Sequence, residues 1–167
     1  MSSSNTARSL VAVLVLAAST LVAVMQQEGY EGQAMIPVPG DVYTYGYGTT
    51  KGVHKGDRID PVRASIRLLD EIENVYAAGV RQCVTAPLYP HEFGTYVTLA
   101  YNIGVGAFCR KAKPGKPPNL IDLINSQQYA AACQRIEAFN KFHGKPLRGL
   151  TILRAKQRAA CEGKNDN

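Results

Sequence analysis

Two carboxylates and a hydroxyl stand within one short stretch of the chain, Glu28 to Gly48, which is rich in tyrosine and glycine. Glu28 precedes a turn, Asp41 lies within it and Thr44 follows it. A carboxylic acid that donates a proton and a carboxylate that activates a water are the groups that cleave a glycosidic bond. We therefore interpret Glu28, Asp41 and Thr44 as a candidate catalytic set, with Glu28 as the acid.

Each member of this set also has an ordinary structural interpretation. Glu31 is a rival acid, because it lies three residues after Glu28 and falls on a similar helical face. Asp41, in a Gly-Asp turn, can simply satisfy backbone amides, and Thr44 can be an ordinary strand residue. Three tyrosines of the ribbon that follows can line a glycan cleft or pack within a sheet: Tyr43, Tyr45 and Tyr47.

A small antiparallel sheet is expected to position these groups. Residues 34–40 contain two prolines and a glycine, which mark a turn. Residues 43–50 alternate with period two, which is typical of a strand, and the glycines among them indicate a close approach by a helix or a sugar ring. The expected strands are Met35–Val38, Val42–Gly48 and Val53–His54.

Helices are expected over the rest of the chain. Asp60 followed by Pro61 is a strong helix start, and apolar residues recur at three- and four-residue spacing to about Arg81. Shorter helices are expected at 91–102, 120–124, 130–142 and 151–161, with loops at 111–118 and 144–149. The predicted fold class is α+β, a small sheet lobe and a mainly helical lobe joined by the long helix.

The composition narrows the function classes. A net charge of +6 and a pI near 9.2 favour an acidic partner such as an anionic cell-wall polymer. Nucleic acid is disfavoured because no arginine-aromatic cluster or basic helix stands out. Three histidines and four cysteines without a Cys-x-x-Cys pair offer no metal-ligand spacing, so we expect no metal and no cofactor.

The four cysteines suit two disulfides if the chain reaches an oxidising compartment. Three connectivities are possible. We prefer Cys83 with Cys109 and Cys133 with Cys161, because each pair would tie helices within one lobe.

The N-terminus indicates export. Residues 9–25 carry no charge, and their number is at the low end of what spans a bilayer, roughly 17 to 25. Arg8 on one side and glutamates on the other place the C-terminal body outside the cytoplasm. The segment is a cleaved signal peptide, a permanent anchor, or a segment that inserts and later leaves the membrane. An inserted segment would hold Glu28 against the headgroups.

Several of these features occur in an order that resembles a known family: an uncharged N-terminal segment, Glu28-Gly29, the ribbon 44–48, a long helix, Tyr101-Asn102-Ile103-Gly104, and Gly149-Leu150 with Arg154. The chain resembles the phage lysozyme-type endolysins of glycoside hydrolase family 24, specifically those with a signal-anchor-release N-terminus. The resemblance implies such a segment at residues 1–27 and a lysozyme-like muramidase domain at residues 28–167.

The family hydrolyses the β-1,4 bond between N-acetylmuramic acid and N-acetylglucosamine, and the resemblance favours inversion. Its pattern is Glu, eight residues, Asp, five residues, Thr. Glu28 and Thr44 match by their neighbours, but Pro37 stands at the second carboxylate position and the spacing is one residue longer. Asp41 is the carboxylate left in the turn. Tyr45, Tyr47 and Asn102 are candidate substrate contacts, and Arg154 is expected to anchor an ion pair in the helical lobe.

The resemblance also implies a lysis enzyme held in the inner membrane facing the periplasm, then released as a soluble periplasmic monomer. Its partners are peptidoglycan strands and, before release, the host inner membrane. No cysteine lies in the segment or at the catalytic positions, so withdrawal of the anchor on depolarisation is the expected switch. A catalytically dead, tethered wall-binding module is the alternative, with Pro37 as its best argument, and a periplasmic inhibitor or assembly protein is a third.

Overall fold

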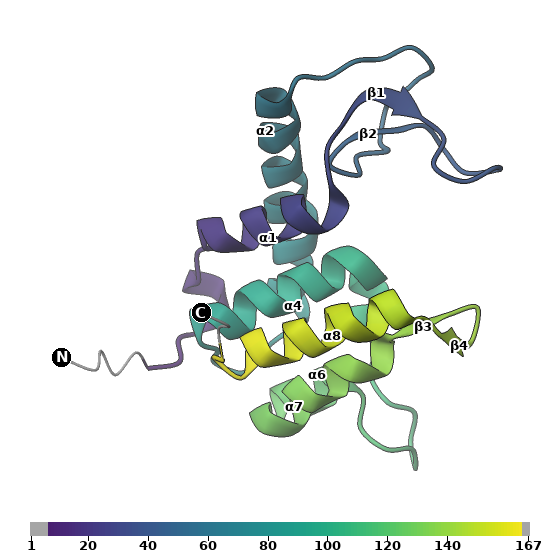
Figure 1. Cartoon of the computed structure of the whole chain (residues 1–167). Coiled ribbons are helices and arrows are strands. Elements are labelled where there is room, and N and C mark those ends of the chain that lie inside the picture. Colours follow the sequence, from purple (N-terminus) through teal and green to yellow (C-terminus); the bar gives the residue numbers. More distant parts are fainter. Residues whose placement is uncertain (1–6, 165–167) are drawn as a thin grey trace. The chain divides into compact units, whose positions relative to one another are not determined.

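The computed structural model describes residues 7–164, and the chain divides into two compact units. One unit, Ala18–Asn74, carries the hairpin that follows Glu28, and we call it the hairpin unit. The other combines the residues before Ala18 with those from Val75 onward, and we call it the helical unit. Helices with small antiparallel sheets confirm the expected α+β class (Figure 1).

The hairpin unit begins with α1 (Ala18–Glu28). Strands β1 (Glu31–Met35) and β2 (Thr44–Gly46) follow and pair antiparallel, with Met35 opposite Thr44. The strand predicted at Val42–Gly48 is confirmed as β2, over a shorter range. The first was predicted at Met35–Val38, which is wrong, because Pro37 in that range has no N–H to give to the ladder. Val53–His54 was also predicted as a strand, and it lies outside any strand in the structure.

Helix α2 (Pro61–Glu71) begins where Asp60 and Pro61 predict it. The Asp60 carboxylate accepts hydrogen bonds from the N–H groups of Val62 and Arg63, both at 3.0 Å, which satisfies two donors of the first turn. The helix also explains a glycine of the ribbon. Gly46 has φ +65°, and a Cβ on it would lie 3.2 Å from the Cβ of Ala64. The sequence left two explanations for this glycine, a helix or a sugar ring close to it. The contact with α2 supports the helix.

Helical residues continue beyond α2 through a π-helical stretch, Ile72–Ala77, into α3 (Ala78–Cys83), close to the predicted end. The helical unit then adds α4 (Pro90–Ile103), α5 (Val105–Phe108), α6 (Leu120–Asn125), α7 (Tyr129–Arg135), the 3-10 turn Ile136–Phe139, β3 (Lys141–Phe142), β4 (Lys145–Pro146) and α8 (Arg148–Cys161). The loop predicted at 144–149 is therefore partly wrong, since it contributes β4 and the first turn of α8.

Helix α4 forms the centre of the helical unit. Its residues from Glu92 to Ala100 are all buried, and α8 packs beside it (Figure 1). The structure contains both disulfides in the preferred pairing. Cys83 at the end of α3 is bonded to Cys109, and Cys133 on α7 to Cys161 on α8. The first bond ties α3 to the residue after α5, and the second joins α7 to α8, so both lie within this one unit.

The uncharged N-terminal segment forms more than one element. Val11–Val13 is a 3-10 turn in the helical unit, whereas α1 starts at Ala18 in the hairpin unit. Helix α1 also runs across the boundary that we expected between residues 27 and 28. Within residues 7–164, no helix combines the length and the apolar character needed to cross a membrane.

Candidate active site

Glu28 is the last residue of α1, and its carboxyl lies in surroundings that favour the protonated form. Although the residue as a whole is exposed, burial of its carboxyl raises the pKa of Glu28, and a hydrogen bond from Gln27 Nε2 to Glu28 Oε1, at 3.0 Å, acts in the opposite direction. The C-terminal end of a helix also disfavours a carboxylate. A raised pKa is what a group that donates a proton near neutral pH requires.

Gly29 explains why a glycine follows the candidate acid. It adopts φ +72°, and its N–H donates to the carbonyl of Met25 at 3.0 Å, so it ends α1 in the left-handed conformation that glycine tolerates best. The chain then turns directly into β1. The Glu28-Gly29 pair thus presents the carboxyl at the junction between helix and hairpin.

Asp41 lies exposed in the turn between the two strands. Its Oδ1 accepts a hydrogen bond from the N–H of Val42 at 2.8 Å, and its own N–H donates to the carbonyl of Val38 at 3.0 Å. One carboxylate oxygen therefore serves the backbone, as the structural interpretation expects. The other oxygen accepts no hydrogen bond from residues 7–164 and can bind a water.

Thr44 opens β2 and is half-buried. Its hydroxyl donates to the carbonyl of Val42 at 3.3 Å, which is long for a bond between oxygens. Asp41 and Thr44 therefore bind the two backbone groups of the same residue, one the N–H and the other the carbonyl. The two candidate side chains therefore both lie beside Val42, despite the unusual spacing of the turn.

Glu31, the rival acid, is the first residue of β1 and is exposed. Its Oε1 accepts from the N–H of Gln33 at 3.3 Å. It lines an open hollow of about 500 Å³ in the hairpin unit, and Glu28, Asp41 and Thr44 are not among the lining residues. The hollow is lined by Tyr30, Glu31, Gly32, Gln33, Arg58, Ile59, Asp60 and Arg63. Its walls carry two arginines, and neither was singled out from the sequence.

The tyrosines proposed as substrate contacts are mostly packed. Tyr45 is 7% and Tyr47 is 9% exposed, so little of either ring is available to a sugar. The Tyr45 hydroxyl accepts from Arg67 Nη1 at 2.5 Å, and the ring of Tyr47 lies 5.6 Å from that of Tyr30. These contacts favour the packing interpretation. Tyr30, which the sequence did not single out, is 42% exposed and follows the Glu28-Gly29 pair directly.

Asn102 belongs to a polar network in the helical unit. Its side-chain oxygen accepts from Arg154 Nη1 at 2.7 Å and from Gln157 Nε2 at 3.3 Å. Arg154 is 2% exposed, also donates to the carbonyl of Phe139 at 3.1 Å, and burial lowers its pKa. The predicted ion pair of Arg154 is wrong, because its partners among residues 7–164 are neutral. Only the amide hydrogens of Asn102 remain for a substrate contact.

Known proteins with similar sequences and folds include phage proteins. A family model described as phage lysozyme matches residues 25–157. The SAR-endolysin of Haemophilus phage HP1 (strain HP1c1) is 31% identical over 135 residues, 75% of this chain and 69% of that protein. The endolysin of Bacillus phage PZA is 29% identical over 79% of this chain and 49% of that protein, so the chain spans about half the length of that relative.

A solved structure has a similar fold. The muramidase domain of SpmX from Asticaccaulis excentricus superposes with a TM-score of 0.77 over 89% of this chain and 97% of that domain, at 22% identity. At this identity the likeness concerns the fold.

Proposed function

Because the chain belongs to the phage lysozyme family and has a lysozyme-like fold, we propose that it is a peptidoglycan-degrading endolysin. The proposed reaction is hydrolysis of the β-1,4 bond between N-acetylmuramic acid and N-acetylglucosamine. The observation that carries this proposal is the setting of Glu28, a carboxyl at a helix end whose pKa is raised by burial. Such a carboxyl keeps its proton to a higher pH than a solvated one, as a general acid must.

In the proposed mechanism, Glu28 protonates the oxygen of the leaving sugar. Asp41 accepts a proton from a water through the oxygen that does not bind Val42, and the water attacks the opposite face of the ring. The Thr44 hydroxyl orients that water, because its long bond to the Val42 carbonyl leaves it free to turn. Attack from the opposite face inverts the configuration at the reacting carbon. In this proposal a substrate contact through Tyr45 or Tyr47 is limited to the small part of each side chain that is exposed. Asn102 is a separate candidate contact in the helical unit, through its amide hydrogens.

We further propose that the protein works as a monomer exported by residues 1–27, which hold residues 28–167 at the inner membrane facing the periplasm before release. Two observations support this part. A similar protein is named a SAR-endolysin, and α1 runs from the uncharged segment directly into Glu28. While that segment lies in a bilayer, the helix that ends at Glu28 cannot take its place in the hairpin unit. Tethering would therefore keep the acid out of position.

A catalytically dead, membrane-tethered module that binds peptidoglycan is the second candidate function. It is favoured by Pro37, which stands where the family carries its second carboxylate, and by the bond from Asp41 to its own turn. The two candidates predict opposite results on peptidoglycan, since only the enzyme removes it.

Zymography of the full chain on peptidoglycan separates the two candidates. We expect clearing by the unaltered protein, loss of clearing in Glu28→Gln and in Asp41→Asn, and clearing that persists in Glu31→Gln. A folded protein, verified by circular dichroism, that clears no peptidoglycan would refute the enzyme. If only Glu31→Gln abolishes clearing, the acid is Glu31.

Carbonate extraction of membranes tests the anchor. Before an uncoupler is added, we expect the chain in the membrane fraction, and after depolarisation in the soluble fraction. A chain that stays in the membrane fraction both times is permanently anchored. A chain that is soluble both times, and shorter than the full sequence by mass, has been cleaved.

A further inference from the structure

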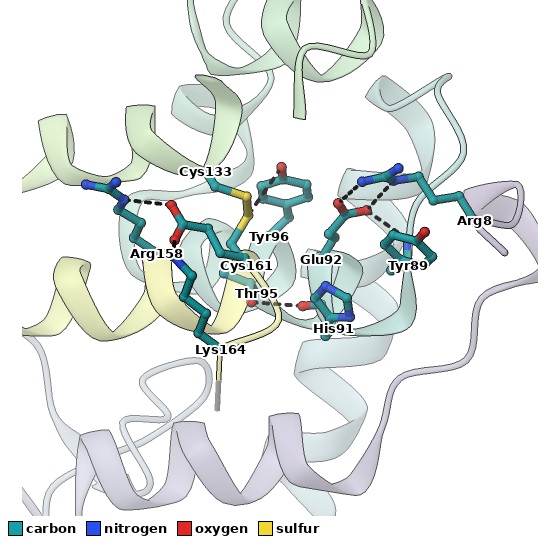
Figure 2. Close-up of a disulfide and its surroundings, with 11 residues drawn as sticks. Arg8, Tyr89, His91, Glu92, Thr95, Tyr96, Cys133, Arg158, Cys161 and Lys164 are labelled. Atoms are coloured by element: carbon teal, nitrogen blue, oxygen red, sulfur yellow. Dashed lines mark hydrogen bonds and ion pairs between the residues drawn. A yellow bond between two sulfur atoms is a disulfide. The ribbon is translucent and has the colours of Figure 1, made fainter. Parts of the chain in front are cut away.

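Arg8, the residue just before the uncharged segment, is bound by a carboxylate of the helical unit. Its Nη2 lies 2.7 Å from Glu92 Oε1 and its Nε lies 3.0 Å from Glu92 Oε2, so the two side chains make a two-pronged contact (Figure 2). The Glu92 side chain is 3% exposed and that of Arg8 is 29% exposed. This geometry is the strong form of a charge-assisted hydrogen bond.

Two tyrosine rings complete the surroundings of the guanidinium. Its central carbon lies 3.7 Å from the ring centroid of Tyr129 and 4.2 Å from that of Tyr89. The Tyr129 hydroxyl donates to the carbonyl of Pro87 at 2.7 Å, which fixes that ring, and the N–H of Tyr89 donates to Glu92 Oε2 at 2.8 Å. The carboxylate and both rings are therefore held by the helical unit itself.

The residues after Arg8 lie along the same unit, and we call Arg8–Leu14 the arm. Ser9 and Leu88 exchange two backbone hydrogen bonds of 2.9 and 2.8 Å. Arg81 Nη2 donates to the carbonyl of Leu14 at 2.9 Å, and the side chains of Val11 and Leu14 are buried. The arm is thus fastened by backbone bonds and apolar contacts, with Arg8 at its outer end.

We propose that Glu92, Tyr89 and Tyr129 form a guanidinium-selective binding site that latches the arm onto the helical unit. Glu92 also caps α4, so it stays buried whether or not a cation is present. A buried carboxylate without a cation is costly, which gives the site a strong preference for an occupant. A lysine ammonium cannot supply two parallel N–H groups and a flat face for both rings, and a guanidinium can.

One consequence rests on the proposed function. If residues 9–25 cross the inner membrane with the body outside, Arg8 stays on the cytoplasmic side and Glu92 lies on the other side. The latch and membrane insertion then exclude each other. Binding of Arg8 by Glu92 would hold the released arm on the body and oppose its return to the bilayer.

Hydrogen exchange of the full chain in solution tests the latch, with the amides of Ser9 and Leu88 as the readout because they bond across the arm. We expect Arg8→Lys and Arg8→Ala to reduce their protection by at least about tenfold, since Ala removes both charge-assisted bonds to Glu92 and Lys can replace only one of them. Arg158→Lys is the matched control, because Arg158 also binds carboxylates within the helical unit, and it should change this protection less than about twofold. Protection in Arg8→Lys equal to that of the unaltered chain would overturn the proposal.

Chemical rescue tests selectivity. In Arg8→Ala, millimolar ethylguanidinium should restore part of the lost protection, and ethylammonium at the same concentration should restore much less. Equal rescue by the two cations, or none by either, contradicts a guanidinium site. If Arg8→Ala does not fold, the protection in Arg8→Lys alone decides. These readouts require neither activity nor a membrane. If carbonate extraction shows that the chain is never membrane-bound, the anchor is refuted, and the exchange data still test the latch.

Discussion

Replacing Glu28 by Gln is expected to remove activity and raise stability in the same protein. Burial raises the pKa of Glu28, so the folded state holds this proton more tightly than the unfolded state does. Stability from this group is therefore fully present below the unfolded pKa and is lost as the pH rises through the folded pKa. At a pH above the folded pKa, the ionised carboxylate sits unfavourably at the C-terminal end of α1. Gln carries no charge and escapes this cost.

The size of both effects follows from the position of Glu28. A charge of the unfavourable sign at a helix end costs about 0.3–1 kcal/mol. For a chain of this length that corresponds to a rise in Tm of about 1–4 °C at a pH above the folded pKa of Glu28. Loss of a general acid lowers the rate by about 10²- to 10⁴-fold, or about 3–5.5 kcal/mol in the barrier. The stability gain should vanish at a pH low enough to protonate Glu28.

Thermal unfolding followed by circular dichroism at several pH values measures the gain, and turbidity loss of a peptidoglycan suspension measures the rate. Glu31→Gln is the matched control, because that carboxylate is exposed at the start of a strand and not at a helix end, so this substitution should not raise Tm. A Glu28→Gln protein that is less stable than the unaltered chain at the highest pH of the series, or whose gain is the same at every pH, would refute the reasoning.

Three further outcomes are expected. Cys133→Ser with Cys161→Ser opens a loop of 28 residues and should cost about 3.5 kcal/mol in urea unfolding, and a loss below about 1 kcal/mol would contradict the loop-entropy argument. Arg154→Ala leaves the Asn102 oxygen without its closest donor and should cost roughly 2–3 kcal/mol in the same assay, while an unchanged midpoint would show that the network is not structural. Thr44→Val should slow peptidoglycan clearing by roughly 10- to 100-fold with an unchanged circular dichroism spectrum, and full activity would exclude the hydroxyl from water positioning.

Local chemistry made part of the fold predictable. Asp60 and Pro61 start a helix because a carboxylate and a missing N–H suit its first turn, and the structure shows both effects. Pairing between strands was less predictable. The first strand ends at Met35 and does not begin there, because the partner of each strand residue lies elsewhere in the chain. The residues within the turn do not by themselves determine which residues of the two strands lie opposite each other.

For the candidate site too, the sequence indicated some features and only the structure showed the others. Residue types and neighbours in the sequence select Glu28 and Thr44, and the structure adds that Asp41 and Thr44 meet at one residue, Val42. The sequence did not indicate that Tyr45 would be buried beneath Arg67, because exposure depends on what packs over a strand. Sequence also did not show which groups Arg154 would bind.

By itself, the sequence determined the chemistry available between Glu28 and Thr44, the helix start at Asp60 and an apolar, uncharged N-terminal segment. Only the tertiary structure decided that part of this segment lies on the helical unit, with Val11 and Leu14 buried there. The hydrophobic effect has no direction, so an apolar segment is suited equally to lipid and to a protein surface. Glu92, the partner of Arg8, is 84 residues away in the sequence, and no local sequence pattern predicts a contact over that separation.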